Sequence, residues 1–142
     1  MFDIGKEYNR KSDLHEIYSG QSQGGISTPA KYPLIFIFTS DAGEQHGYKD
    51  EYRDDGIFWY TGEGQVGDMK MTSGNKAILN HAKNNKTIHI FESTKSAHVR
   101  YIGSAECLGY HEETRLDREG EDRTAFVFHL DINSSAANNE IL

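Results

Sequence analysis

Residues whose types could do chemistry are concentrated between positions 48 and 68, where acids, aromatic residues and glycines follow one another. Four of the six residues at positions 50–55 are acids, namely Asp50, Glu51, Asp54 and Asp55. Paired carboxylates can perform acid–base catalysis, but a dense acidic run is more often a solvated turn. The aromatic run 58–60 then leads into glycine-rich chain, where a backbone without Cβ atoms can approach a ligand closely. The region therefore predicts a binding site, and a small-ligand enzyme that uses the acidic loop is an alternative.

Motifs for catalysis or cofactor binding are weak. Residues 62–67 spell G-x-G-x-x-G, but the following DMKMTSGN is not the apolar helix that a dinucleotide site requires. The chain has no Gly-x-Ser-x-Gly elbow, and its one cysteine, Cys107, cannot form an internal disulfide. None of the seven histidines has another four residues away, the spacing of many metal sites on helices. We predict no catalytic residue, no metal and no cofactor.

Composition describes a folded domain with an uneven charge distribution. The 142 residues suggest one domain, and 36% hydrophobic with 26% charged residues is a soluble globular composition. The longest apolar run, at 34–38, is far shorter than the roughly 20 residues that span a bilayer, so we expect no membrane partner and a cytoplasmic location. The net charge of −7 argues mildly against a nucleic-acid partner. Residues 69–100, however, contain six Lys or Arg and a single acid, which is a candidate phosphate-facing patch.

The elements that must position these residues are mainly strands. We predict five, at residues 33–40, 57–61, 86–92, 97–107 and 124–132. Short helices are predicted at 8–18 and from Ser73 to the stop at Asn84-Asn85, with Ser73 as the cap. Cys107, His89 and His129 fall in strands and are expected to be structural. The acidic segment 111–123 is predicted to be a solvated connection, and 133–142 a polar tail or linker after a domain at 1–132. This order predicts an α+β fold with a mixed or antiparallel, barrel-like sheet.

The stretch from Tyr48 to Phe91 resembles the core of the SRA family, the SET-and-RING-associated domains that read modified cytosine in DNA. The family pattern is a tyrosine near acids, an Asp-Gly pair, an aromatic strand that ends in Tyr-Thr-Gly, a glycine-rich loop and an Asn-x-Ala helix. The matching residues are Tyr48, Asp50, Glu51, Asp55-Gly56, 58–62, 64–67 and 75–78. The form of these motifs is most similar to reader modules fused to HNH nucleases in bacterial modification-dependent restriction enzymes. The resemblance implies a twisted PUA/SRA-like sheet with two or so flanking helices.

The resemblance also implies a pocket for a base flipped out of the duplex. Tyr48 and Tyr60 are the stacking candidates, with Trp59 expected in the core. A carboxylate that accepts from the cytosine N4 amine distinguishes cytosine from thymine, and Asp50 is favoured over Glu51 for this role. The remaining loop residues of the expected pocket are Thr61, Gly62, Glu63 and Gly64. Expected contacts to the DNA backbone are Gln21, Gln23, Ser27, Lys70, Lys76, Lys83 and Arg100.

The function that follows is a non-catalytic reader of 5-methyl- or 5-hydroxymethylcytosine in double-stranded DNA, acting as the specificity domain of a restriction endonuclease. A fused nuclease domain and a dimer formed through that domain are the expected partners. Only residues 68–74 separate the glycine loop from the Asn-x-Ala helix, so a long finger that probes the vacated duplex position should be short or missing. A PUA-like reader of RNA or methyladenine is the other alternative.

Overall fold

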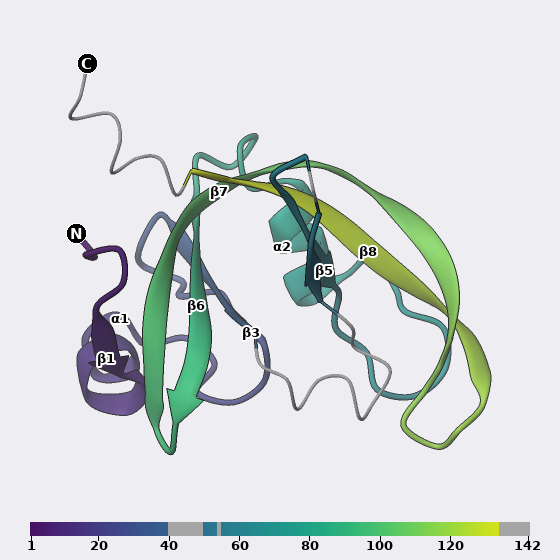
Figure 1. Cartoon of the computed structure of the whole chain (residues 1–142), viewed down its shortest axis with the longest axis horizontal. Coiled ribbons are helices and arrows are strands. Elements are labelled where there is room, and N and C mark those ends of the chain that lie inside the picture. Colours follow the sequence, from purple (N-terminus) through teal and green to yellow (C-terminus); the bar gives the residue numbers. More distant parts are fainter. Residues whose placement is uncertain (40–49, 54, 134–142) are drawn as a thin grey trace.

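A mixed, twisted sheet of eight strands organises the chain in the computed structural model, which describes residues 1–39, 50–53 and 55–133 (Figure 1). The strand order is β2-β3-β6-β7-β8-β5-β4, and β1 pairs separately with β7. Among the described residues the sheet stays open, so the predicted α+β fold is confirmed without a closed barrel. The strands are β1 Glu7–Asn9, β2 Ile26–Ser27, β3 Leu34–Thr39, β4 Glu51–Tyr52, β5 Ile57–Thr61, β6 Thr87–Lys95, β7 His98–Leu116 and β8 Asp122–Asn133.

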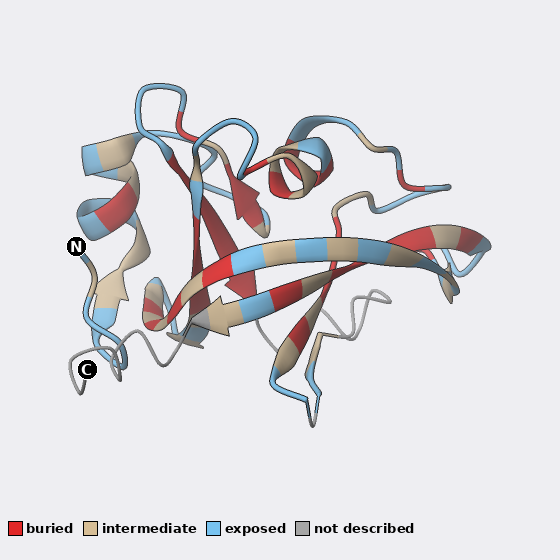
Figure 2. Ribbon diagram, turned by 90° about the horizontal axis from the view of Figure 1, so that it is seen from above, coloured by how far each residue is buried: buried red, intermediate tan, exposed pale blue. Residues whose placement is uncertain are grey.

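The central strands follow the predicted pattern closely. All six residues of β3 are buried, which explains their continuous apolar run, and β3 pairs in parallel with β6. Figure 2 shows buried residues along these central strands. Residues of the two strands alternate between two hydrophobic clusters, one on each face of the sheet. Ile35 and Ile88 belong to the cluster that also contains Phe58 and Phe128, whereas Phe36 lies in the cluster on the other face. The predicted strand at 57–61 coincides with β5.

The prediction of a solvated connection at 111–123 is wrong. Strand β7 continues to Leu116 and β8 begins at Asp122, so the two form one long hairpin with only residues 117–121 in the turn. Exposure alternates residue by residue along this half of β7, which lets a charged sequence occupy a strand with one open face. A register shift between Cys107 and Gly109 marks a β-bulge within the hairpin. Leu108, in the bulge, is 55% exposed.

The helices are shorter than predicted. Instead of one helix at 8–18, the chain forms β1, a π-helical turn η1 (Arg10–His15) and a single turn α1 (Glu16–Tyr18). Tyr8 pairs with Val99 in the sheet, and the Asn9 side chain accepts from the backbone N–H groups of Lys11 and Ser12, which starts the turn there. Helix α2 spans Ser73–Leu79, and its N-cap residue is Thr72 rather than Ser73.

Two further predictions concern membrane-spanning segments and the C-terminal tail. No helix among the described residues is long and apolar enough to cross a membrane. Of the tail predicted at 133–142, Asn133 is the last residue of β8, and residues 134–142 lie outside the described residues, as does Tyr48.

Candidate functional site

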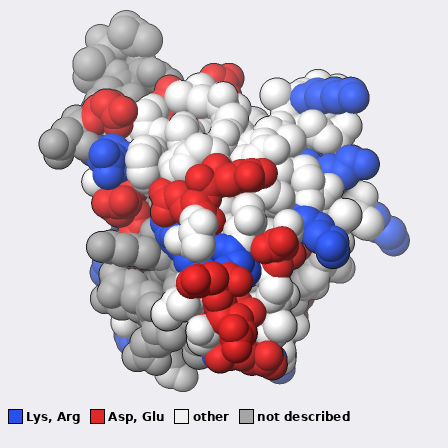
Figure 3. Space-filling view, turned by 90° about the vertical axis from the view of Figure 1, so that its right-hand side faces the viewer, with Lys and Arg blue, Asp and Glu red and all other residues white. Residues whose placement is uncertain are grey.

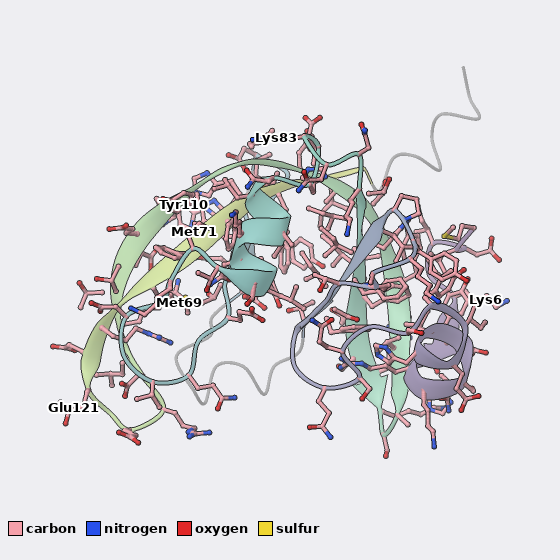
Figure 4. The ribbon with its side chains drawn as sticks, turned by 180° about the vertical axis from the view of Figure 1, so that it is seen from behind. Lys6, Met69, Met71, Lys83, Tyr110 and Glu121 are labelled. Atoms are coloured by element: carbon pink, nitrogen blue, oxygen red, sulfur yellow. The ribbon has the colours of Figure 1, made fainter. Side chains whose placement is uncertain are left out.

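A cavity of about 750 Å³ lies between the end of β5, the loop that follows it, and the N-terminal segment. That size falls within the range of ordinary ligand pockets. The segment that carries Met69 and Met71 toward α2 borders it (Figure 4). Six of the eight residues predicted for the pocket and its loop line this cavity, together with other residues. They are Asp50, Tyr60, Thr61, Gly62, Glu63 and Gly64.

 Of the eight predicted residues, these six therefore line the cavity, Glu51 does not, and Tyr48 lies outside the described residues.

Asp50 is held in a fixed orientation at the cavity wall. Its Oδ1 accepts the backbone N–H of Thr61 at 2.8 Å, and its Oδ2 accepts the Thr39 hydroxyl at 2.7 Å. Burial raises the pKa of the Asp50 carboxyl, while these hydrogen bonds and the charge of Arg115 act in the opposite direction. The carboxylate is thus aligned before any ligand arrives.

Glu51 points to a different part of the surface. It lies in β4 opposite Trp59, and its carboxylate is 3.5 Å from the Arg53 guanidinium. With Tyr52, Arg53 and Asp55 it lines a separate small pocket. Of the two acids, Asp50 lines the cavity and Glu51 does not, while the role of Asp50 toward a base stays a prediction.

The aromatic residues of β5 divide between the two faces of the sheet. Tyr60 lines the cavity but is only 4% exposed, and its hydroxyl donates to the Gly25 carbonyl at 3.1 Å. The prediction that Trp59 is a core residue is wrong, because it lies half-buried on the opposite face. There its ring stacks on His129 at a centroid distance of 5.3 Å, and the Arg53 guanidinium covers it at 4.1 Å. Alternation along the strand gives the core to Phe58 and Tyr60 instead.

Asn75, which sequence reasoning did not assign to the site, anchors the glycine loop from α2. It is 1% exposed and accepts the Glu63 N–H at 2.8 Å, while its amide donates to the carbonyls of Glu63 at 2.9 Å and Lys70 at 3.0 Å. A Cβ on Gly62 would lie 2.5 Å from the Asn75 Oδ1, so glycine is required there for this close approach. The signal in the sequence was the asparagine at a fixed distance after Tyr-Thr-Gly. The Glu63 carboxylate in turn accepts the Gly74 N–H at 2.8 Å.

The far side of the same loop is bound to the tip of the β7–β8 hairpin. Gly67 donates its N–H to the Asp117 carboxylate at 2.9 Å and accepts from the Arg123 guanidinium at 2.8 Å. Asp68 accepts the Thr124 N–H at 2.7 Å. Hydrogen bonds from backbone N–H groups, that of Gly67 first, lower the pKa of Asp117. The rim of the cavity is therefore fixed by residues about fifty positions away, which no local sequence signal could indicate.

A row of polar side chains also reaches the site from the outer face of the hairpin. Arg115 donates to the Thr61 hydroxyl at 2.7 Å and pairs with Glu113 at 2.8 Å. Glu113 contacts His111 at 2.6 Å, and His111 contacts His129 at the same distance. The hydrogen bond from His111 is the main cause that lowers the pKa of Glu113. Within the described part of the chain, no three His, Cys, Asp or Glu side chains are placed to hold a metal ion.

The residues predicted to contact a DNA backbone differ in their exposure and in their ion pairing. Lys70, Lys76 and Lys83 are exposed, and Lys70 also borders the cavity. Arg100 is half-buried and lies 3.5 Å from Glu7 and 3.8 Å from Glu92, so its charge is largely compensated. Figure 3 shows acidic side chains along the middle of one side of the molecule and basic ones projecting at its right-hand edge.

The three polar residues of the 21–27 segment also differ. Gln21 uses its amide to bind Thr28, accepting the backbone N–H at 2.6 Å, and Gln23 is exposed. Ser27 is fully buried, and its hydroxyl has no hydrogen-bond partner among the described residues. A side chain in that position cannot reach a DNA phosphate without a rearrangement of the segment, so Ser27 is not retained as a contact.

Comparison with known proteins agrees with this architecture. The family model for ScoMcrA-like SRA domains matches residues 4–140, and the chain therefore belongs to that family. No curated protein matches the sequence.

Solved structures share the fold at low sequence identity. The sulfur binding domain and SRA domain of ScoMcrA, complexed with phosphorothioated DNA, superposes with a TM-score of 0.73 at 20% identity over 93% of this chain. The MspJI restriction endonuclease with a 27-mer oligonucleotide gives 0.70 at 18% identity over 96%. The SUVH5 SRA domain with fully methylated CG DNA gives 0.65 at 24% over 92%, and 88% of that chain is covered. The chain spans 40% of the ScoMcrA structure and 43% of MspJI, so it corresponds to one part of those larger proteins.

Proposed function

We propose that this chain is a non-catalytic module that reads a modified cytosine, carrying a 5-methyl or 5-hydroxymethyl group, in double-stranded DNA. The modified base leaves the duplex and enters the cavity. The observation that carries the proposal is the Asp50 carboxylate, oriented by Thr61 and Thr39 at the wall of a cavity of about 750 Å³. A carboxylate accepts from the cytosine N4 amine and has no matching donor on thymine.

The surroundings of Asp50 suit an extruded base. Unstacking a base costs a few kcal/mol, which contacts inside the protein must offset. Tyr60 supplies an aromatic wall, and Tyr48 is retained as a second stacking candidate from the resemblance. Exposed Lys70, Lys76 and Lys83 provide charges for phosphates on a chain whose net charge is −7.

The larger proteins that share this fold support a proposal about the wider context. The ScoMcrA structure joins its SRA domain to a sulfur binding domain, and MspJI is a restriction endonuclease of which this chain covers 43%. We propose that this chain is the specificity domain of a modification-dependent restriction endonuclease in the cytoplasm. Its expected partners are a fused HNH nuclease domain and a second copy bound through that domain.

Fluorescence anisotropy with matched duplexes tests the proposal. The duplexes differ only at one central cytosine, which is unmodified, 5-methylated or 5-hydroxymethylated. We expect at least one modified duplex to bind about tenfold more tightly or better, the equivalent of about 1.4 kcal/mol. Equal affinity for all three would reject modified-cytosine reading. A duplex with N6-methyladenine and a matched RNA separate the alternative readers, since preference for either would favour them.

Base extrusion needs its own measurement. A 2-aminopurine placed next to the modified cytosine gains fluorescence when its stacking partner leaves the duplex. We expect the gain with the modified duplex and little change with the unmodified one. Tight, selective binding without any gain would keep modification reading but reject entry of the base into the cavity.

A further inference from the structure

The cavity has a second charged side chain, which no motif indicated. Arg10, at the start of η1, lines the cavity together with Asp50. Its guanidinium lies over the ring of Phe38, with Cζ 3.6 Å from the ring centroid. Its Nε donates to the His15 Nε2 at 2.9 Å, and its Nη2 donates to the Gly24 carbonyl at 2.9 Å. Three contacts from three segments thus fix the plane of the group.

This cation is only partly used by the protein. An arginine carries five N–H donors, and hydrogen bonds to the described residues occupy two of them. No carboxylate in the described ranges lies within ion-pair distance of Arg10, in contrast to Arg53, Arg100 and Arg115. Partial burial lowers the pKa of Arg10, but arginine stays protonated in proteins. A rigid, charged fork with unused donors therefore faces the cavity.

We infer that Arg10 is a second recognition point of the cavity and binds two neighbouring anionic oxygens on the nucleotide that Asp50 reads. The inference rests on the proposed function. The planar guanidinium presents parallel N–H groups that match paired oxygens of a phosphate or carboxylate, a geometry that a lysine cannot reproduce. Stacking on Phe38 keeps the fork in place without using its donors.

Two sources could supply these oxygens. One is the backbone phosphate next to the extruded nucleotide, which would make Arg10 an anchor for any flipped base. The other is a carboxylate on the C5 position of the cytosine, which would make Arg10 a determinant of which modification is preferred. Both have the same chemistry at the guanidinium, and the experiment separates them.

The central comparison is between Arg10→Met and Lys11→Met. Lys11 is the next residue of η1, is exposed and makes no side-chain hydrogen bond or ion pair with the described residues, so both variants lose the same charge from the same turn. On a 5-carboxylcytosine duplex, which offers both the phosphate and the carboxylate, we expect Arg10→Met to bind about tenfold more weakly or worse, the typical loss of a hydrogen-bonded charge pair. Lys11→Met should change the affinity about twofold at most. Equal losses in both variants overturn the inference.

Modified duplexes then identify the source. If a phosphate is bound, a neutral methylphosphonate beside the modified cytosine weakens the wild type as much as Arg10→Met does and weakens that variant no further. If a carboxylate is bound, the wild type prefers 5-carboxylcytosine over 5-methylcytosine and Arg10→Met loses that preference. A loss in Arg10→Met with no response to either duplex means that Arg10 acts only by holding Gly24, which rejects the anion contact.

Folding and the proposed function are checked separately. Arg10→Lys keeps the charge but lacks the fork, so reduced affinity at an unchanged melting temperature supports the inference even if Arg10→Met does not fold. If Arg10→Lys binds with wild-type affinity, the claim that the planar guanidinium binds two oxygens is rejected. If the wild type does not distinguish modified from unmodified duplex, the proposed function fails. If it does distinguish them and Arg10→Met binds as tightly as the wild type, only the Arg10 inference fails.

Discussion

The two charged walls of the cavity differ in how completely the protein uses their polar groups. On one wall, both oxygens of Asp50 accept hydrogen bonds from the protein, and Thr61 is in turn bound by Arg115. On the other wall, Arg10 lies over the Phe38 ring and has more N–H donors than it has acceptors among the described residues. Hydrogen bonds within the fold orient the Asp50 carboxylate, which is buried as a result. Stacking on Phe38 orients the Arg10 guanidinium and leaves N–H donors for a ligand.

This difference shows how one cavity can hold both a precisely oriented acceptor and a permanently charged donor group. A buried carboxylate without partners would be neutralised by a raised pKa, so Asp50 needs its two donors to remain useful as an acceptor. A guanidinium stays charged without such help, because its pKa is far above neutral. The Asp50 wall should therefore depend strongly on the loop behind it, and the Arg10 wall should not.

The largest expected effect comes from removing the anchor of the Asp50 wall. Asn75→Ala deletes three hydrogen bonds to Glu63 and Lys70, and at about 1 kcal/mol each we expect the free energy of unfolding to fall by about 3 kcal/mol. Urea denaturation measures this change. Lys76→Ala, an exposed neighbour on the same helix, should stay within about 0.5 kcal/mol of the wild type. A similar stability for both variants would show that the loop does not depend on Asn75.

The next effect is on binding alone. Asp50→Asn replaces the acceptor that we propose for the base amine, and we expect affinity for modified duplex to fall by about 1–3 kcal/mol. The free energy of unfolding should not fall with it, because burial disfavours the ionised carboxylate that the substitution removes. Glu51→Gln, outside the cavity, is the matched control and should bind like the wild type. Loss of binding in Glu51→Gln instead would move the site to the other acid.

A smaller effect comes from pH, which should change stability and DNA affinity in opposite directions. Since the folded-state pKa of Asp50 is raised, its proton binds more tightly to the folded than to the unfolded chain. On acidification, the stability of the wild type relative to Asp50→Asn should therefore rise, while its affinity for modified DNA falls. Melting and anisotropy from pH 7.5 down to about 3.9, the ordinary pKa of an aspartate, measure the two trends. Two parallel trends would be inconsistent with Asp50 as the titrating acceptor.

The smallest effect separates free from paired cations. Lys70→Ala should weaken binding to all duplexes alike and reduce the slope of log affinity against log salt by about 0.9, the value for one phosphate contact. Arg100→Ala should leave that slope unchanged, because Glu7 and Glu92 already share its charge. A salt titration of both variants decides this. An equal change in slope would restore Arg100 to the DNA contacts.

Much of the fold was predictable because its central strands have strong local patterns. The apolar run of β3, the alternation in β6 and the aromatic run of β5 each indicate a strand without any tertiary information. The outer half of β7 was missed, since its charged residues pair with one another across an open face and resemble a loop in sequence. The helix at 8–18 was overpredicted, because the pairing of Tyr8 with Val99 overrides its helical spacing.

The site was predictable only where its residues are neighbours in sequence. Asp50 and the residues from Tyr60 to Gly64 were found through the resemblance, and all of them line the cavity. Arg10, Asn75 and Arg115 were not assigned to it, because the fold brings them in from distant segments. Trp59 was misplaced for a different reason, since strand alternation separates two faces but does not tell which face is the core.

The attachment of the cavity rim to the hairpin tip also bears on how the chain folds. The bonds from residues 65–68 to Asp117, Arg118, Arg123 and Thr124 close loops of 50 or more residues. Such contacts repay their loop-closure entropy only after β7 and β8 have paired. We therefore expect the rim to form late, with φ-values near zero, and its amides to exchange with solvent before those of β3 and β6. A rim that forms late should also open at low energy in the folded protein, beside the cavity that we propose for the base.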